Sequence, residues 1–309
     1  MSSSRASSSA RLLAIAAEYA AADPPRVDEA IECIDRVAQE GGGAEAQGLV
    51  VRAFLALGQP EAAHGRLMRW AAECPADADA ALRMGCATRI AREVMRAPAR
   101  ALTTLRTLLR RIPGDHAALT LAEEVALECP SLDGMFAVYN DLSAAAAGEH
   151  ARHAVAYRRA LLLERAGRVG DALLEQFGLF LKSPSLGASF TAIERLAPRA
   201  VRDDVLVRAL GLLAIQATAP ETRARYYLAA ADVARDRCQD ARLALLLELL
   251  AYQSAHDPGV EASLRRHVRA MRADAPDVAR AAAEVLIDDA LASAHQTWDD
   301  NLRRTHSLN

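Results

Sequence analysis

The chain has 309 residues, with 37 basic and 40 acidic side chains and a formal net charge of -3. Hydrophobic residues make up 52% of the chain but aromatic residues only 4%, and alanine is the most abundant of the hydrophobic residues. An Ala-, Leu-, Arg- and Glu-rich composition favours helices and excludes an all-β fold. The nearly balanced charge disfavours a dedicated nucleic-acid-binding protein, because such proteins usually carry a basic excess.

The N-terminus is Ser-rich, and we expect residues 1–10 to form a disordered tail. A targeting segment is the alternative, because residues 2–9 include Arg5 and no acidic residue. No apolar run reaches the roughly 18 residues that a membrane span needs. We therefore expect a cytoplasmic protein of bacterial type.

The rest of the chain is predicted to be helical, in segments of about 10–20 residues separated by proline or glycine. Proline cannot continue a helix interior, and the residue before it avoids the helical region. Breaks are predicted at residues 24–25, 41–43, 58–60, 75, 98, 113–114, 130, 148, 167, 184, 198, 220, 258 and 276. Helices are expected to continue beyond residue 184, over 186–197, 199–218, 221–238, 240–255, 260–273 and 277–304.

The breaks are periodic. The stops at residues 42, 75, 113, 148 and 184 are separated by 33, 38, 35 and 36 residues. Two segments also share the order glycine, alanine after five residues and proline after another 12. These residues are Gly58, Ala63 and Pro75 in the first, and Gly167, Ala172 and Pro184 in the second. Self-similarity at this period predicts stacked helical hairpins, which bury their apolar faces against their neighbours.

Segments 44–75 and 153–184 resemble tetratricopeptide repeats. Each has a large apolar residue in its first helix, Phe54 or Leu163, followed by the glycine, alanine and proline named above. The chain departs from the family where Gln47 and Ala156 stand at its tryptophan position. The resemblance is clear over roughly residues 44–184. It implies an all-α, right-handed α-solenoid of about seven to eight stacked antiparallel helix pairs. We expect such repeats over 11–184, degenerate repeats or a helical cap over 185–297, and a tail over 298–309.

In this family the first helix of each hairpin lines a concave groove that binds peptides. The resemblance therefore implies a partner-binding groove whose residues are Arg52, Tyr157, Leu161, Glu164 and Arg165. This mixture of arginine and apolar side chains suits an acidic or amphipathic segment of a partner protein. Gly48 and Arg52 stand where the members that bind chaperone C-termini carry Lys and Asn, so that partner is not expected.

The sequence lacks recognisable catalytic or metal motifs. The aspartate pairs at 203–204, 288–289 and 299–300 do not continue as DDxxD, and His150 and His153 lack a third ligand at a suitable spacing. There is no P-loop, GxGxxG or GxSxG. We expect no catalytic residues, no cofactor and no metal.

Three groups of arginines could bind acidic peptides, phosphate or an RNA backbone. They are Arg83, Arg89, Arg92, Arg96 and Arg100; Arg152, Arg158, Arg159 and Arg165; and Arg265, Arg266, Arg269 and Arg272 with His267. Ion pairs with the many acidic residues are the favoured interpretation. The apolar segment 243–250 is expected to be core or an interface.

The sequence thus predicts a non-catalytic scaffold or adaptor that binds other proteins, alone or as a subunit of a larger complex. The alternatives are an RNA-binding helical-repeat protein and an all-α enzyme without a recognisable motif. The partner, the pathway and the oligomeric state do not follow from the sequence.

Overall fold

The computed structural model describes residues 2–23, 26–39, 44–185, 187–272 and 276–289, and throughout these residues the regular elements are helices. The all-α class is therefore confirmed. The first helices are α1 (Ser2–Ala21), α2 (Val27–Gln39), α3 (Ala44–Ala56), α4 (Pro60–Glu73), α5 (Asp77–Arg89), a π-helical stretch η1 (Ile90–Val94), α6 (Pro98–Arg111), α7 (His116–Glu128) and α8 (Asp133–Ala145). They are followed by α9 (Glu149–Arg165), α10 (Val169–Lys182), α11 (Gly187–Arg199), α12 (Asp203–Gln216), α13 (Pro220–Asp236), α14 (Ala241–Ala255), α15 (Pro258–Ala270) and a further helical segment at 276–289.

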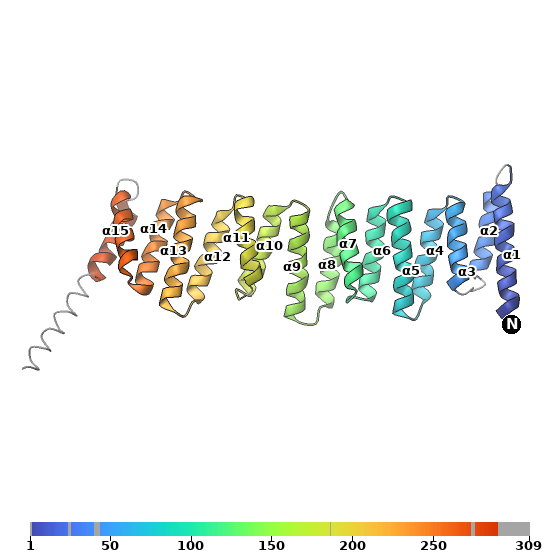
Figure 1. Cartoon of the computed structure of the whole chain (residues 1–309), viewed down its shortest axis with the longest axis horizontal. Coiled ribbons are helices and arrows are strands. Elements are labelled where there is room, and N and C mark those ends of the chain that lie inside the picture. Colours follow the sequence, from blue (N-terminus) through green and yellow to red (C-terminus); the bar gives the residue numbers. More distant parts are fainter. Residues whose placement is uncertain (1, 24–25, 40–43, 186, 273–275, 290–309) are drawn as a thin grey trace, which may run out of the picture. The chain divides into compact units, whose positions relative to one another are not determined.

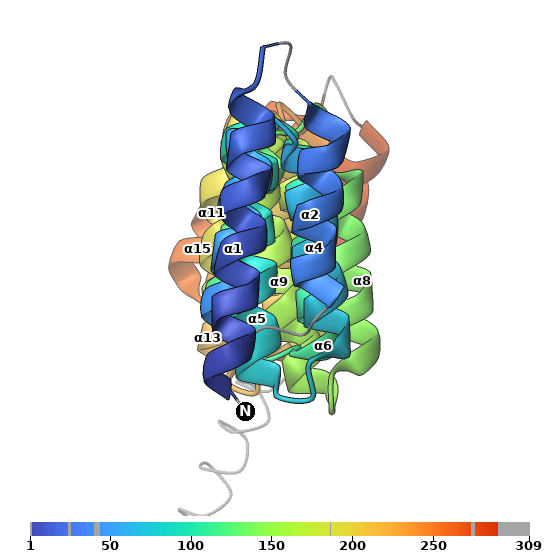
Figure 2. The ribbon, with the colours of Figure 1, turned by 90° about the vertical axis from the view of Figure 1, so that its right-hand side faces the viewer.

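The chain forms two compact units, Met1–Val155 and Ala156–Asn309, whose boundary lies inside α9. Within each unit, consecutive helices pack against each other in chain order (Figure 1). Figure 2 shows the first pair, α1 and α2, running antiparallel and side by side. Within the units, pairs also pack on one another, as α4 does on α5 and α12 on α13. This is the predicted array of stacked hairpins.

Two glycines end helices as the sequence predicted. Gly58 follows α3 with φ +68° and Gly167 follows α9 with φ +76°. The Gly58 N–H donates to the Leu55 carbonyl (3.0 Å), and the N–H of Gln59 donates to the Phe54 carbonyl (2.8 Å). The turn at Gly167 repeats both bonds, at 3.0 and 2.9 Å. This is the Schellman motif, in which a left-handed residue satisfies the last carbonyls of a helix.

The same motif ends α11, but at a different place from the one predicted. The sequence predicted a break at Pro198, whereas α11 continues through Pro198 to Arg199. The donors that close the turn are the N–H groups of Val201, to the Pro198 carbonyl, and of Arg202, to the Ala197 carbonyl. Proline is tolerated here because it removes only one hydrogen bond near the helix end. The left-handed position, with φ +54°, is occupied by Val201.

The N-terminal segment also differs from the expectation. Helix α1 begins at Ser2, where we expected a disordered tail over 1–10. Serine has only a moderately lower helix propensity than alanine, and the segment contains neither glycine nor proline to end a helix. The C-terminal tail expected at 298–309 lies outside the described residues.

Each unit has its own apolar core. In the first, Ile34, Val50, Phe54, Leu67 and Trp70 pack together from α2, α3 and α4. In the second, Leu245, Tyr252, Leu264, Val268 and Leu286 join α14, α15 and the segment 276–289. The repeated alanines Ala63 and Ala172 are fully buried, as expected for small residues that let helices approach closely. No helix of the described chain is long and apolar enough to cross a membrane.

Polar contacts between neighbouring hairpins follow the repeat. Arginine and carboxylate partners in successive hairpins lie 31 to 36 residues apart, close to the predicted period of 33–38. These pairs include Arg66 with Asp35, Arg106 with Asp141, Arg195 with Glu164 and Arg242 with Asp277. Equivalent positions of successive hairpins are therefore linked by arginine and carboxylate side chains.

Candidate partner-binding surfaces

The predicted groove residues fall on two helices. Arg52 lies on α3 in the first unit and is exposed. The other four lie on the part of α9 that belongs to the second unit, which brings them together. Tyr157, Leu161 and Arg165 are spaced by four residues and so lie along one side of the helix. Leu161 is 39% exposed, Arg165 is exposed and Tyr157 is partly buried.

Glu164, the fourth of these residues, is tied to α11. Its carboxylate accepts hydrogen bonds from Arg195 (Nη2 to Oε2, 2.8 Å) and from Arg199 (Nη1 to Oε1, 2.5 Å). Hydrogen bonding from Arg195, and then from Arg199, holds the pKa of Glu164 below its usual range. Tyr157 lies close enough to Arg195 to add to the rise in that arginine's pKa, which Glu164 mainly causes.

These contacts define a surface of mixed character, which we call the α9–α11 surface. It consists of Tyr157, Leu161, Glu164, Arg165, Arg195 and Arg199. Sequence reasoning missed Arg195 and Arg199. Their separation of 31 and 35 residues from Glu164, which is one repeat, is the signal that could have found them. Three guanidinium groups against one carboxylate give this surface a positive charge beside exposed apolar groups.

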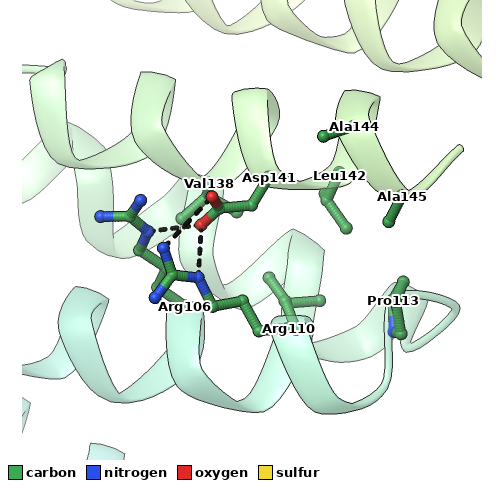
Figure 3. A pocket seen from close by; sticks show the side chains of 9 residues that line it. Arg106, Arg110, Pro113, Val138, Asp141, Leu142, Ala144 and Ala145 are labelled. Atoms are coloured by element: carbon green, nitrogen blue, oxygen red, sulfur yellow. Dashed lines mark hydrogen bonds and ion pairs between the residues drawn. The ribbon is translucent and has the colours of Figure 1, made fainter.

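A pocket of about 260 Å³ lies between α6 and α8 in the first unit (Figure 3). Asp141 of α8 faces two arginines of α6 across it. Its Oδ2 accepts from Arg106 Nε at 2.6 Å and from Arg110 Nε at 2.8 Å, and Arg110 Nη2 lies 3.2 Å from Oδ1. Hydrogen bonds from Arg106, and then from Arg110, hold the pKa of Asp141 far below its usual range.

The polar groups of this pocket therefore satisfy one another. Both carboxylate oxygens of Asp141 accept hydrogen bonds from arginine, and the remaining lining is apolar, including Leu109, Val138 and Leu142. An acid held so firmly in its ionised form is a poor proton donor near neutral pH. The pocket thus joins two hairpins and offers no group suited to acid–base chemistry.

Some arginines of the groups identified in the sequence have side-chain partners. Arg83 donates to Gln47 of α3 at 3.2 Å, Arg92 pairs with Glu128 of α7, and Arg159 pairs with Glu175 of α10. Ion pairing was the favoured interpretation of the sequence, and it holds for Arg92 and Arg159. Arg269 of α15 and Arg272, in the turn after it, are exposed and have no side-chain partner in the described part of the chain.

A buried carboxylate was also missed. Glu248 of α14 is 2% exposed and lies in the predicted apolar segment 243–250. Its Oε1 accepts from Arg235 of α13, and its Oε2 lies 2.6 Å from Nδ1 of His267 of α15. A buried charge needs such partners, so this cluster holds three helices together. On the other side of α14, Leu243, Leu246 and Leu250 are partly exposed.

Among the described residues, no group of three His, Cys, Asp or Glu side chains is placed to hold a metal ion. His153 Nε2 instead lies 3.5 Å from Oε1 of Glu149, on the preceding turn of α9. The aspartate pair 299–300 lies outside the described residues.

Comparisons with known proteins assign no family. No protein-family model matches the chain, and no curated protein matches it. Among solved structures, the chain is similar to one described as "Computational Design of Self-Assembling Cyclic Protein Homooligomers", at 17% identity over 93% of this chain and 95% of that one. The TM-score is 0.13, so the similarity carries no argument about fold or function.

Proposed function

We propose that the protein is a non-catalytic, tetratricopeptide-like scaffold that binds an acidic or amphipathic segment of a partner protein. The observation that supports this proposal best is the α9–α11 surface. It places the partly exposed Leu161 and Tyr157 beside three arginines and a single carboxylate. Tyrosine and arginine are the residues that most often dominate the energy of protein–protein interfaces.

The chemistry of this surface favours a peptide with carboxylates next to an apolar side chain. Arg165 is exposed and has no partner in the described residues, so it can pair with a carboxylate without breaking an existing contact. Arg195 and Arg199 already share Glu164, which fixes their guanidinium groups in place and lowers the entropy lost on binding. Arg52 of α3 lies in the first unit and is a separate candidate contact.

The proposal can be tested by placing a photo-crosslinking amino acid at position 161 of the full-length protein and irradiating native lysate. We expect a protein adduct that resists nuclease. Arg165→Glu should reduce the adduct at least about fivefold, because it puts a negative charge where the partner needs a positive one. Arg52→Glu tests the contribution of the first unit in the same way.

Lys182→Glu is the matched control, because it reverses another exposed cation of the same unit, at the end of α10. It should leave the adduct unchanged. Circular dichroism should show that all the variants are folded. An adduct that is equally strong in Arg165→Glu, or that is lost on nuclease treatment, would overturn the proposal. Loss on nuclease treatment would favour the RNA-binding alternative.

A further inference from the structure

A second pocket, of about 400 Å³, lies between α15 and the helical segment 276–289. We call it the α15 pocket. Its arginines are Arg265, Arg269 and Arg272, and its apolar lining includes Val268, Leu286 and Ile287. Its volume is in the range of sites that bind small ligands or single anchoring side chains.

The floor of the α15 pocket is part of the core of the second unit. Val268 is 5% exposed and Leu286 is 6% exposed, and both belong to the apolar cluster that joins α14, α15 and the segment 276–289. His267, on the same helix as the arginines, contacts the buried Glu248. The floor is thus formed before any partner arrives. Ile287, 57% exposed, forms an apolar rim.

The charge of this pocket is not balanced. Arg265 and Arg269 are one turn apart on α15, and Arg272 lies in the turn that follows the helix. Arg265 pairs with Glu261 at 2.5 Å, whereas the other two have no side-chain partner in the residues that the structure describes. The α6–α8 pocket differs in this respect, because there Asp141 joins both arginines. Among the described residues, the α15 pocket therefore presents two guanidinium groups without a carboxylate partner above an apolar floor.

We propose that the α15 pocket is a second binding site, for an acidic protein segment that carries a large apolar side chain between carboxylates. The apolar side chain would cover Val268, Leu286 and Ile287, and the carboxylates would pair with Arg269 and Arg272. Single-stranded nucleic acid fits less well, because it binds largely by stacking on aromatic side chains and the pocket lining contains none. The site is separate from the α9–α11 surface and does not depend on it.

Binding can be measured by fluorescence anisotropy with the full-length protein and a short labelled peptide in which tryptophan is flanked by aspartates. We expect the double variant Arg269→Glu with Arg272→Glu to lower the affinity at least about tenfold and to reduce its salt dependence. Replacing the peptide's tryptophan by serine should also lower the affinity about tenfold, because the apolar floor then stays uncovered.

Arg266→Glu is the control for charge, because Arg266 is an exposed arginine of the same helix that does not line the pocket. It should change the affinity less than about twofold, by the screened long-range field alone. Ile287→Ser tests the apolar rim at a position where folding is not at risk. Equal affinity in the wild type and the double variant would overturn the proposal, and so would an RNA oligonucleotide of matched length that binds more tightly than the peptide.

The two proposals can fail separately. Arg165→Glu should leave binding of the peptide at the α15 pocket unchanged. If instead Arg165→Glu abolishes binding and the Arg269 and Arg272 reversals do not, the peptide occupies the α9–α11 surface. The second site is then wrong, whereas the proposed scaffold function stands.

Discussion

Val201 occupies the turn position that glycine holds after α3 and α9. Its φ of +54° is left-handed, and its side chain is 86% exposed, so packing does not compensate for the backbone conformation. A left-handed conformation costs an L-residue roughly 1–2 kcal/mol, and a β-branched side chain is especially unsuited to it. The turn between α11 and α12 is therefore formed against a local preference that Gly58 and Gly167 avoid.

Val201→Gly should stabilise the protein by about 1 kcal/mol. The substitution relieves the backbone strain, and the larger conformational entropy of glycine in the unfolded chain offsets part of that gain. Urea unfolding followed by circular dichroism measures this, and hydrogen exchange localises it to α11 and α12. Gly167→Val is the reciprocal variant. A Cβ at Gly167 would meet no atom within 4 Å, so its destabilisation reports backbone conformation alone. A Val201→Gly protein less stable than the wild type would contradict this account.

The candidate site was predicted from the sequence only in part, and the reason lies in single residues. Tyr157, Leu161 and Arg165 could be placed together because their spacing alone puts them on one side of a helix. Glu164 was predicted to face a partner, but it contacts Arg195 and Arg199 of the next hairpin. Which arginine meets which carboxylate depends on how two hairpins pack, and the pattern of one helix does not contain that information.

Asp141 links α6 and α8, and it makes this pair of helices sensitive to acid. Its pKa is lower in the folded protein than in the unfolded chain because Arg106 and Arg110 donate hydrogen bonds to its ionised form. The folded state therefore binds fewer protons at this site than the unfolded state does. The stabilisation is complete above the ordinary pKa of aspartate, about 4, and is lost as the pH falls below that value.

Asp141→Asn should lower the thermal midpoint at neutral pH and flatten its decline between about pH 5 and about pH 2. The measurement is a series of thermal melts at constant ionic strength. Asp133→Asn, at the start of the same helix, is the control, because Asp133 contacts no arginine in the described structure. If wild type and Asp141→Asn lose stability in parallel on acidification, Asp141 is not a source of the acid sensitivity.

Helices and turns were predicted well wherever one residue type decides the backbone. Gly58 and Gly167 supply a left-handed residue, and Pro60 and Pro98 begin α4 and α6. The prediction was wrong at Pro198, because the geometry of the helix end, and not the proline, decides where α11 stops. Beyond residue 184 the family pattern fades, yet α11 to α15 continue to pack in sequence. Apolar periodicity is sufficient for such packing.

The whole molecule divides into two units, and most of its contacts join elements that follow each other in the chain. In arrays of this kind stability is a sum of local terms, and neighbours are coupled more strongly than distant hairpins. A single free energy of unfolding therefore describes such a chain poorly. Damage to a core residue should remain in the unit that contains it.

Phe54→Ala and Phe180→Ala test this, because both rings are almost fully buried, one in each unit. Each substitution should cost its own unit about 3–5 kcal/mol. Hydrogen exchange followed by mass spectrometry should show lost protection in α2 to α4 for Phe54→Ala, and in α10 and α11 for Phe180→Ala, with the other unit unchanged. Uniform loss of protection along the chain in either variant would show that the molecule unfolds as one cooperative body.

The arginine–carboxylate pairs that lie one repeat apart have a consequence for how the chain can change in length. Each pair spans 31 to 36 residues, so a donor in one hairpin finds its acceptor at the matching place in the next. Duplication or excision of one whole hairpin would keep equivalent helices of successive hairpins as neighbours. A cut of half that size would set arginine against the wrong helix. The spacing of these ion pairs thus favours insertions and deletions of a complete hairpin over those of any other length.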